Sequence, residues 1–76
     1  MDFENINEEK KMINIKNKER EECFLQMVDM SGRICYQAEI KPNDYLDLDI
    51  HKFLSGIYTL IFRTTNTSFA QQIVKY

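Results

Sequence analysis

Apolar and polar residues alternate along most of this chain with a period of two, which is typical of strands that bury one face. The clearest alternation lies in residues 45–50, where leucine or isoleucine occupies every second position and tyrosine or aspartate the others. Residues 57–64 form a nearly continuous β-branched and aromatic run, in which Tyr58, Leu60 and Phe62 share one face. The pattern predicts half-buried strands, and no apolar repeat of 3.6 residues indicates a helix.

Turn-forming residues divide this pattern into further strands. Two alternating runs, residues 23–28 and 34–40, flank Asp29-Met30-Ser31-Gly32. Gly32 can adopt the positive φ that a tight hairpin needs, so we expect a two-residue turn at Ser31-Gly32. The return strand ends at Lys41-Pro42-Asn43-Asp44, because proline cannot donate a backbone hydrogen bond to a sheet. This hairpin is the best defined in the chain.

The remaining segments complete an all-β fold. Residues 51–54 fit one tight turn, residues 65–67 fit another, and residues 68–75 form the last strand. A short alternation in residues 12–16 predicts a first strand, whereas residues 1–11 are rich in charge and are expected to be a frayed lead-in. We therefore predict a single domain over residues 12–76 that folds as a small antiparallel β-sandwich of about six or seven strands.

The strand faces also predict the core, which must be thin in a chain of 76 residues. Side chains that share the apolar faces should pack between the two sheets, whereas Tyr45 and Tyr76 should be exposed. The predicted core consists of Leu25, Met27, Leu46, Leu48, Tyr58, Leu60, Phe62 and Phe69.

Charge and composition exclude several classes of function. Ten Lys and Arg against twelve Asp and Glu give a net charge of -2, and no basic stripe marks a nucleic-acid interface. No apolar run approaches the roughly 18 residues of a membrane helix, so membrane insertion is not expected. No charged segment followed by an apolar stretch marks a signal peptide at Met1.

The residues that could carry chemistry are few. Cys23 and Cys35 would lie too far apart in the predicted hairpin to form a disulfide, so we expect both to be buried and unpaired. His51 has neither a nucleophile nor an orienting group at a suitable spacing, and we expect it on the surface. Asp47 and Asp49, together with Asp44, fit a solvated strand face rather than a calcium loop. We predict no catalytic residue, metal site or cofactor, and hence no enzyme.

Three motifs follow one another in a recognisable order. Leu25 to Arg33 contains an apolar strand followed by Asp-Met-Ser-Gly-Arg, the segment Leu54-Ser55-Gly56-Ile57-Tyr58 precedes the strongest strand, and Ile73-Val74-Lys75 lies near the end. These motifs resemble the Asp-Leu-x-Gly-Lys/Arg, Leu-x-x-Gly-x-Tyr and closing apolar-apolar-Lys motifs of the type IX secretion system C-terminal sorting domain of Bacteroidetes-type bacteria. The Pro-Asn-Pro opening usual in that family is absent, as in a diverged Ig-like relative.

This resemblance implies a function as well as a fold. Sorting domains of this family are small Ig-like β-sandwiches that a secretion-machinery protein recognises, so that the protein carrying them is secreted or attached to the cell surface. A different hypothesis is a free-standing Ig-like binding module for a protein or glycan ligand, which would use an edge strand or a tyrosine-bearing face. By the resemblance, the sorting motif would comprise Asp29, Gly32, Arg33, Gly56, Tyr58, Ile73, Val74 and Lys75.

The weakest predicted strand also suggests self-association. Residues 12–16 alternate only briefly, so we expect them to leave one sheet edge poorly covered. An open edge presents unpaired N–H and C=O groups that bind a further strand. We therefore expect a homodimer through this edge strand, by strand pairing or by strand exchange, with Met12 and Ile15 at the contact.

Overall fold

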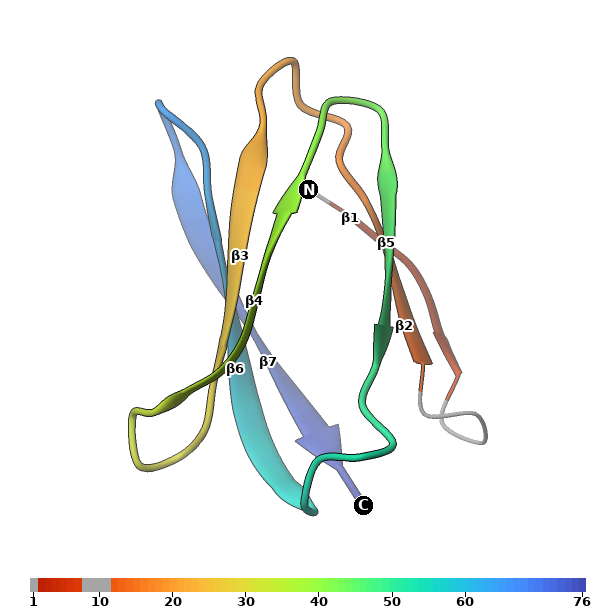
Figure 1. Cartoon of the computed structure of the whole chain (residues 1–76), viewed down its shortest axis with the longest axis vertical. Helices are drawn as coiled ribbons and strands as arrows, with labels where there is room; N and C mark the ends of the chain where they lie inside the picture. Colours follow the sequence, from red (N-terminus) through yellow and green to blue (C-terminus); the bar gives the residue numbers. More distant parts are fainter. Residues whose placement is uncertain (1, 8–11) are drawn as a thin grey trace.

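A computed structural model describes residues 2–7 and 12–76, with side chains from Met12 onward. It contains β1 (Asp2–Asn7), β2 (Met12–Lys16), β3 (Cys23–Val28), β4 (Ile34–Ile40), β5 (Tyr45–Asp49), β6 (Gly56–Arg63) and β7 (Ser68–Lys75) (Figure 1). No helix able to cross a membrane occurs among the described residues.

The strands form two antiparallel sheets that pack face to face (Figure 1). One sheet has the order β1-β2-β5 and the other the order β4-β3-β6-β7. The chain crosses between the sheets three times, after β2, after β4 and after β5. The predicted small antiparallel sandwich is therefore confirmed, with seven strands.

The register of each pair places apolar side chains on the inner faces. In the four-stranded sheet Leu25 lies opposite Phe62. In the three-stranded sheet Ile13 lies opposite Leu48 and Ile15 opposite Leu46. Directly opposite residues of an antiparallel pair point to the same face, so the period-two pattern read from the sequence becomes two facing apolar layers.

The core contains more residues than the sequence predicted. Six of the eight expected residues are buried, and Leu46 packs against them half-buried. Phe69 is 42% exposed, so its prediction as a core residue is wrong. It stacks on Phe62 with 4.9 Å between ring centroids, but β7 is an edge strand and leaves the ring partly open. The buried apolar residues are Ile13, Ile15, Cys23, Leu25, Met27, Ile40, Leu48, Ile50, Tyr58, Leu60, Phe62 and Ile73.

The predicted two-residue turn is also wrong. Val28 pairs with Ile34 and Met27 with Tyr36, so the β3–β4 loop spans residues 29–33 and Cys35 is an extra residue in a β-bulge. Both cysteines are free, as expected, but only Cys23 is fully buried. Cys23 lies opposite Ile40 at the other end of this strand pair, which keeps the two thiols apart.

The first strand begins earlier than predicted. Residues expected to be a frayed lead-in contain β1, which pairs with β2, while residues 1 and 8–11 lie outside the described part of the chain. Consequently β2 is the central strand of its sheet and not an edge. Ile15 is fully buried in this chain, so it is not exposed for the expected contact with a second copy. The sheet edges are instead β1, β5, β4 and β7.

Among residues 12–76, one polar residue, Asn17, is buried. Asn17 follows β2, has no exposed surface, and donates its side-chain amide to the carbonyl oxygens of Ile40 at 2.7 Å and Glu21 at 2.9 Å. Its side-chain oxygen accepts a hydrogen bond of 2.9 Å from the backbone N–H of Glu19. Its backbone exchanges bonds with Asn43 and Asp44. Asn17 therefore ties the β2–β3 loop to the β4–β5 loop.

Candidate functional site

The three sequence motifs meet at one end of the four-stranded sheet. In the β6–β7 pair Gly56 lies opposite Lys75 and Tyr58 opposite Ile73. The β3–β4 loop lies at the same end, which is the lower end in Figure 1. A shallow hollow there is lined by residues 29–31 and 54–58. We call residues 29–33, 54–58 and 73–76 together the motif end.

The Asp29 carboxylate holds the loop of the first motif in shape by accepting hydrogen bonds from residues of that loop. Its Oδ1 accepts hydrogen bonds from the Ser31 N–H at 2.9 Å, the Ser31 hydroxyl at 2.7 Å and the Arg33 N–H at 3.0 Å. These bonds, with the hydroxyl of Ser31 as the largest cause, lower the pKa of Asp29 to about 2. Gly32 has φ +88°, and the space around its Cα is open, so the backbone conformation and not crowding favours glycine. Asp29 and Gly32 therefore shape the loop.

The loop presents a different pair of side chains to solvent. The Arg33 Nε lies 3.3 Å from Asp29 Oδ2, yet the Arg33 side chain is 83% exposed. Met30 is 78% exposed at the loop tip. An exposed ion pair of this kind adds little stability, so Arg33 is available for a contact outside the domain.

The second motif likewise stabilises the structure of its own turn. Tyr58 is buried, and its hydroxyl donates a hydrogen bond of 2.6 Å to the carbonyl oxygen of Leu54. Gly56 has φ +153°, a conformation that an L side chain rarely adopts. These two residues fix the turn that carries Leu54, whose side chain is 84% exposed.

The third motif divides between the two faces of β7. Ile73 is buried in the core, whereas Val74 is 50% exposed on the outer face. Lys75 donates from Nζ to the carbonyl oxygen of His51 at 2.8 Å and also to that of Phe53. Lys75 therefore anchors the turn after β5 to the last strand.

The structure thus separates the expected site residues into two groups. Six of them build the motif end: Asp29, Gly32, Gly56, Tyr58, Ile73 and Lys75. Arg33 and Val74 remain exposed on it, together with apolar side chains outside the eight expected motif residues: Met30, Leu54 and Tyr76. The signal for these was present, since Met30 and Leu54 are apolar residues inside turns, where exposure is the rule.

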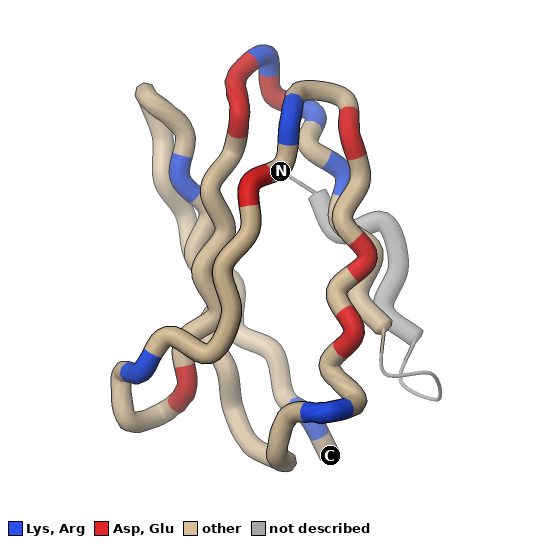
Figure 2. The backbone as a smooth tube through the Cα atoms, in the orientation of Figure 1, with Lys and Arg blue, Asp and Glu red and all other residues tan. Residues whose placement is uncertain are grey.

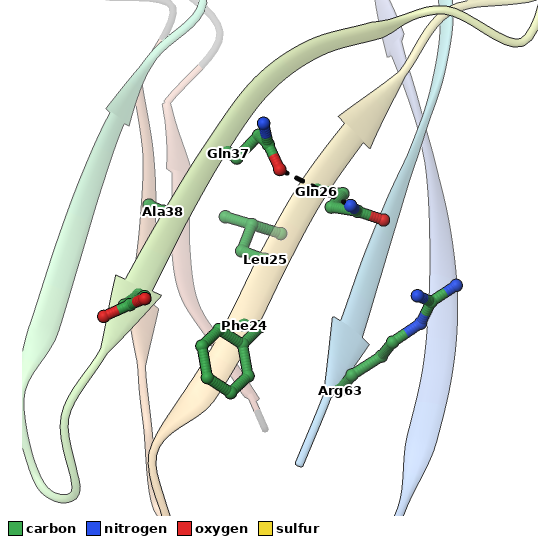
Figure 3. A pocket seen from close by; sticks show the side chains of 7 residues that line it. Phe24, Leu25, Gln26, Gln37, Ala38 and Arg63 are labelled. Atoms are coloured by element: carbon green, nitrogen blue, oxygen red, sulfur yellow. Dashed lines mark hydrogen bonds between the residues drawn. The ribbon is translucent and has the colours of Figure 1, made fainter.

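A second hollow lies on the outer face of the same sheet, away from the motif end. Phe24 and Arg63 lie directly opposite each other on β3 and β6, and Gln26 and Gln37 share a hydrogen bond of 3.5 Å beside them (Figure 3). The ring is that of a phenylalanine, so the expected tyrosine-bearing face is not found at this hollow. Nearby, the carboxyl of Glu22, through a hydrogen bond and its charge, raises the pKa of Glu39.

The polar residues considered for chemistry take part in local hydrogen bonds. His51 is exposed, and its backbone N–H donates a hydrogen bond to Asp49 Oδ1 at 2.9 Å. Asp47 accepts a hydrogen bond from Asn14 on the neighbouring strand. Among residues 12–76, no three His, Cys, Asp or Glu side chains are grouped so that they could hold a metal ion.

Comparisons with known proteins agree with this architecture. Residues 7–76 match the family described as the secretion system C-terminal sorting domain. The fold is similar to the crystal structure of a DUF3244 family protein with an immunoglobulin-like β-sandwich fold from Bacteroides vulgatus. That similarity has a TM-score of 0.78 at 19% identity and covers 88% of this chain and 77% of the other. The search of the curated proteins found no match.

Proposed function

Because the chain belongs to the family of secretion system C-terminal sorting domains, we propose that a protein of a type IX secretion machinery recognises it at the motif end. Recognition would direct the protein that carries this domain to the cell surface or the medium. The role is that of a binding surface and needs no catalytic step. The described part of the chain offers a folded surface for it.

One observation carries this proposal. Motifs separated by 20 and by 14 intervening residues in the sequence converge at one end of the sandwich, as the Gly56–Lys75 pair and the hollow shared by residues 29–31 and 54–58 show. Most motif residues are used to hold this end in shape, while Arg33 and Val74 stay accessible. A partner would therefore contact an exposed apolar group beside one guanidinium, which is the composition of many interface centres.

The test is export of a reporter fused ahead of the domain in a host that has this machinery. Val74→Asp, which changes an exposed side chain, should leave the thermal midpoint nearly unchanged and retain the reporter inside the cell. Deletion of residues 73–76 should also retain it, but this change removes the buried Ile73 as well. Ala70→Asp, on the same strand and outer face, is the matched control and should be exported normally.

Normal export of both Val74→Asp and the deletion would contradict recognition at the motif end. Arg33→Glu provides a second probe on a different loop, and we expect a partial loss of export. Arg63→Glu at the opposite end of β6 is its matched control. Equal loss in the Arg33 and Arg63 variants would show that overall charge, and not this surface, matters.

The free-standing binding module is a second candidate, favoured by the hollow around Phe24. This ring is 48% exposed, and Gln26, Gln37 and Arg63 line the same hollow, which suits a glycan or protein ligand. Phe24→Ala should abolish glycan or protein binding if the hollow is the ligand site. The same Phe24→Ala variant should export the reporter normally if the motif end is the recognised surface.

A further inference from the structure

The four sheet edges of this sandwich differ in how they are protected against pairing. Edge strands are commonly blocked by charges, by bulges, by proline or by being short. β5 has five residues and contains Asp47 and Asp49, both exposed. β4 contains the bulge at Cys35 and is followed by Lys41 and Pro42. β1 contains Asp2 and Glu4 and has an irregular register with β2.

β7 lacks these protections over residues 68–74, and its one charged residue, Lys75, lies at its end. It is eight residues long and carries no charged residue between Ser68 and Val74 (Figure 2). Its register with β6 runs from Gly56 opposite Lys75 to Arg63 opposite Ser68 without a shift, so the strand is regular. Residues 68–72 are all exposed, on both faces of the sheet. In the described sheets β7 is hydrogen-bonded to β6 alone.

Most inner-face side chains of β7 are also left uncovered by the other sheet. Phe69, Gln71 and Ile73 lie opposite the inward-facing Phe62, Leu60 and Tyr58, so all three belong to the inner face. Only Ile73 is buried there. The amide of Gln71 donates a hydrogen bond of 3.0 Å to the carbonyl oxygen of the adjacent Gln72, a contact made along the strand itself. An uncharged, regular strand with open backbone and an uncovered aromatic ring is suited to pairing with another strand.

We propose that β7 pairs antiparallel with β7 of a second copy of this chain, forming a homodimer with one continuous eight-stranded sheet. A second copy supplies a strand of the required kind, because it is equally long, regular and free of charge between Ser68 and Val74. A charged partner strand would find no opposite charge on β7 between Ser68 and Val74. The interface is isologous, with a twofold axis perpendicular to the sheet.

The faces of β7 select the register. Directly opposite residues must point to the same face, so inner residues meet inner residues. Centring the axis on Gln71 places Phe69 opposite Ile73 of the second copy, and the exposed ring gains an apolar neighbour. Centring it on Gln72 would place Phe69 opposite Lys75, whose ammonium group is already bound to the carbonyl oxygens of the β5–β6 turn. The first register is therefore preferred, and in it the two Gln71 side chains face each other across the axis.

This register can be tested with charges at a single position. Gln71→Lys places two ammonium groups directly opposite each other, and Gln71→Glu places two carboxylates there. Like charges opposite each other in a strand pair are destabilising, so each variant alone should raise the dimer dissociation constant about fivefold or more. An equimolar mixture of the two variants should restore or exceed the wild-type affinity, because each lysine then meets a glutamate. Gln71 is exposed, so both variants should keep the fold.

Gln37→Lys and Gln37→Glu are the matched controls, since Gln37 is an exposed glutamine on β4 at the opposite edge of the same sheet. The measurement is the mass from sedimentation equilibrium between about 1 μM and 1 mM, supported by circular dichroism of every variant. We expect a concentration-dependent dimer for the wild type and both controls, and a dimer in the mixed sample. The isolated chain suffices, so the result does not depend on the proposed sorting function.

Three outcomes would overturn the proposal. A wild-type chain that stays monomeric to 1 mM would exclude self-pairing, and the open edge would then be left for an extended strand of another protein. A dimer that is weakened by the Gln37 variants and not by the Gln71 variants would place the contact at β4. A mixture of Gln71 variants no tighter than either variant alone would exclude the twofold arrangement centred on Gln71.

Discussion

Replacing Asn17 by alanine should destabilise the domain more than any other substitution of a polar residue in the described loops. The side chain has no exposed surface and makes three hydrogen bonds, of 2.7, 2.9 and 2.9 Å, to backbone groups. Each such bond contributes about 0.5 to 1.5 kcal/mol net, and a buried carbonyl left without its donor costs about 1 to 3 kcal/mol. Allowing for water entering at the loop surface, we expect a loss of about 2 to 4 kcal/mol.

Such a loss is large for a domain of this size, whose whole stability is on the order of 5 to 10 kcal/mol. Each kcal/mol corresponds to a shift of about 4 to 8 °C in the thermal midpoint. The variant should therefore melt roughly 8 to 30 °C below the wild type. Far-UV circular dichroism is the suitable signal because the chain contains no tryptophan.

Asn66→Ala is the matched control. Asn66 donates its side-chain amide to Glu21 Oε1 at 3.1 Å on the surface, so its loss should change stability by less than about 0.5 kcal/mol. Asn17→Asp should be at least as damaging as Asn17→Ala at neutral pH, because a carboxylate cannot donate to the carbonyl oxygens of Ile40 and Glu21. An Asn17→Ala protein within about 1 kcal/mol of the wild type, or no more affected than Asn66→Ala, would refute the assigned role.

Three further changes test the core, the first loop and the thiols. Leu60→Ala removes a fully buried side chain and should cost about 2 to 5 kcal/mol by urea denaturation, whereas a change below about 1 kcal/mol would contradict the core assignment. Asp29→Asn should lower the free energy of unfolding at neutral pH. Because the pKa of Asp29 in the folded protein is depressed to about 2, this stability gap between wild type and variant should persist above about pH 4 and close as the pH falls toward 2. A gap that is constant from pH 7 to 2 would exclude the charged hydrogen bonds as its source. Burial raises the pKa of the Cys23 thiol, so Cys35, which is half-buried, should be alkylated first in the native protein, and equal rates measured by mass spectrometry would argue against this difference.

The sequence predicted the features that depend on local periodicity. Leu48 and Ile50 alternate with Asp47 and Asp49, and an alternation of this kind assigns the inner face wherever the strand has a sheet packed against it. The same reasoning misplaced Phe69, because the extent of cover over an edge strand is decided by the other sheet. Periodicity within β7 contains no information about that sheet.

The features that the sequence did not reveal depend on pairing across the chain. Residues 2–7 carry charges and lack a clear alternation, so their pairing with β2 could not be expected, and β2 was taken for an edge. The five-residue β3–β4 loop is set by hydrogen bonds to the Asp29 carboxylate, which a search for a Ser-Gly turn does not consider. Asn17 stands beside a charged segment in the sequence, where a solvated turn is the usual outcome.

The motif end shows a related limit. The motif residues lie together in the structure, but the motifs did not distinguish residues that hold this end in shape from residues whose side chains are exposed on it. That distinction came from the hydrogen bonds of Tyr58 and Lys75 and from the exposure of Arg33 and Val74.

The crossing of the chain between the two sheets has a consequence for how the domain folds. The β2–β5 pairing joins residues such as Ile13 and Leu48, and the β3–β6 pairing joins residues such as Leu25 and Phe62. The chain segments enclosed by these two pairings overlap, and the residues of each named pair lie more than 30 positions apart in the sequence. Since the buried core combines residues from both sheets, we expect both sheets to form in one cooperative step, and the long-range pairings place the domain among slowly folding topologies of high contact order. Far-UV circular dichroism and amide exchange should then report one shared unfolding transition for both sheets.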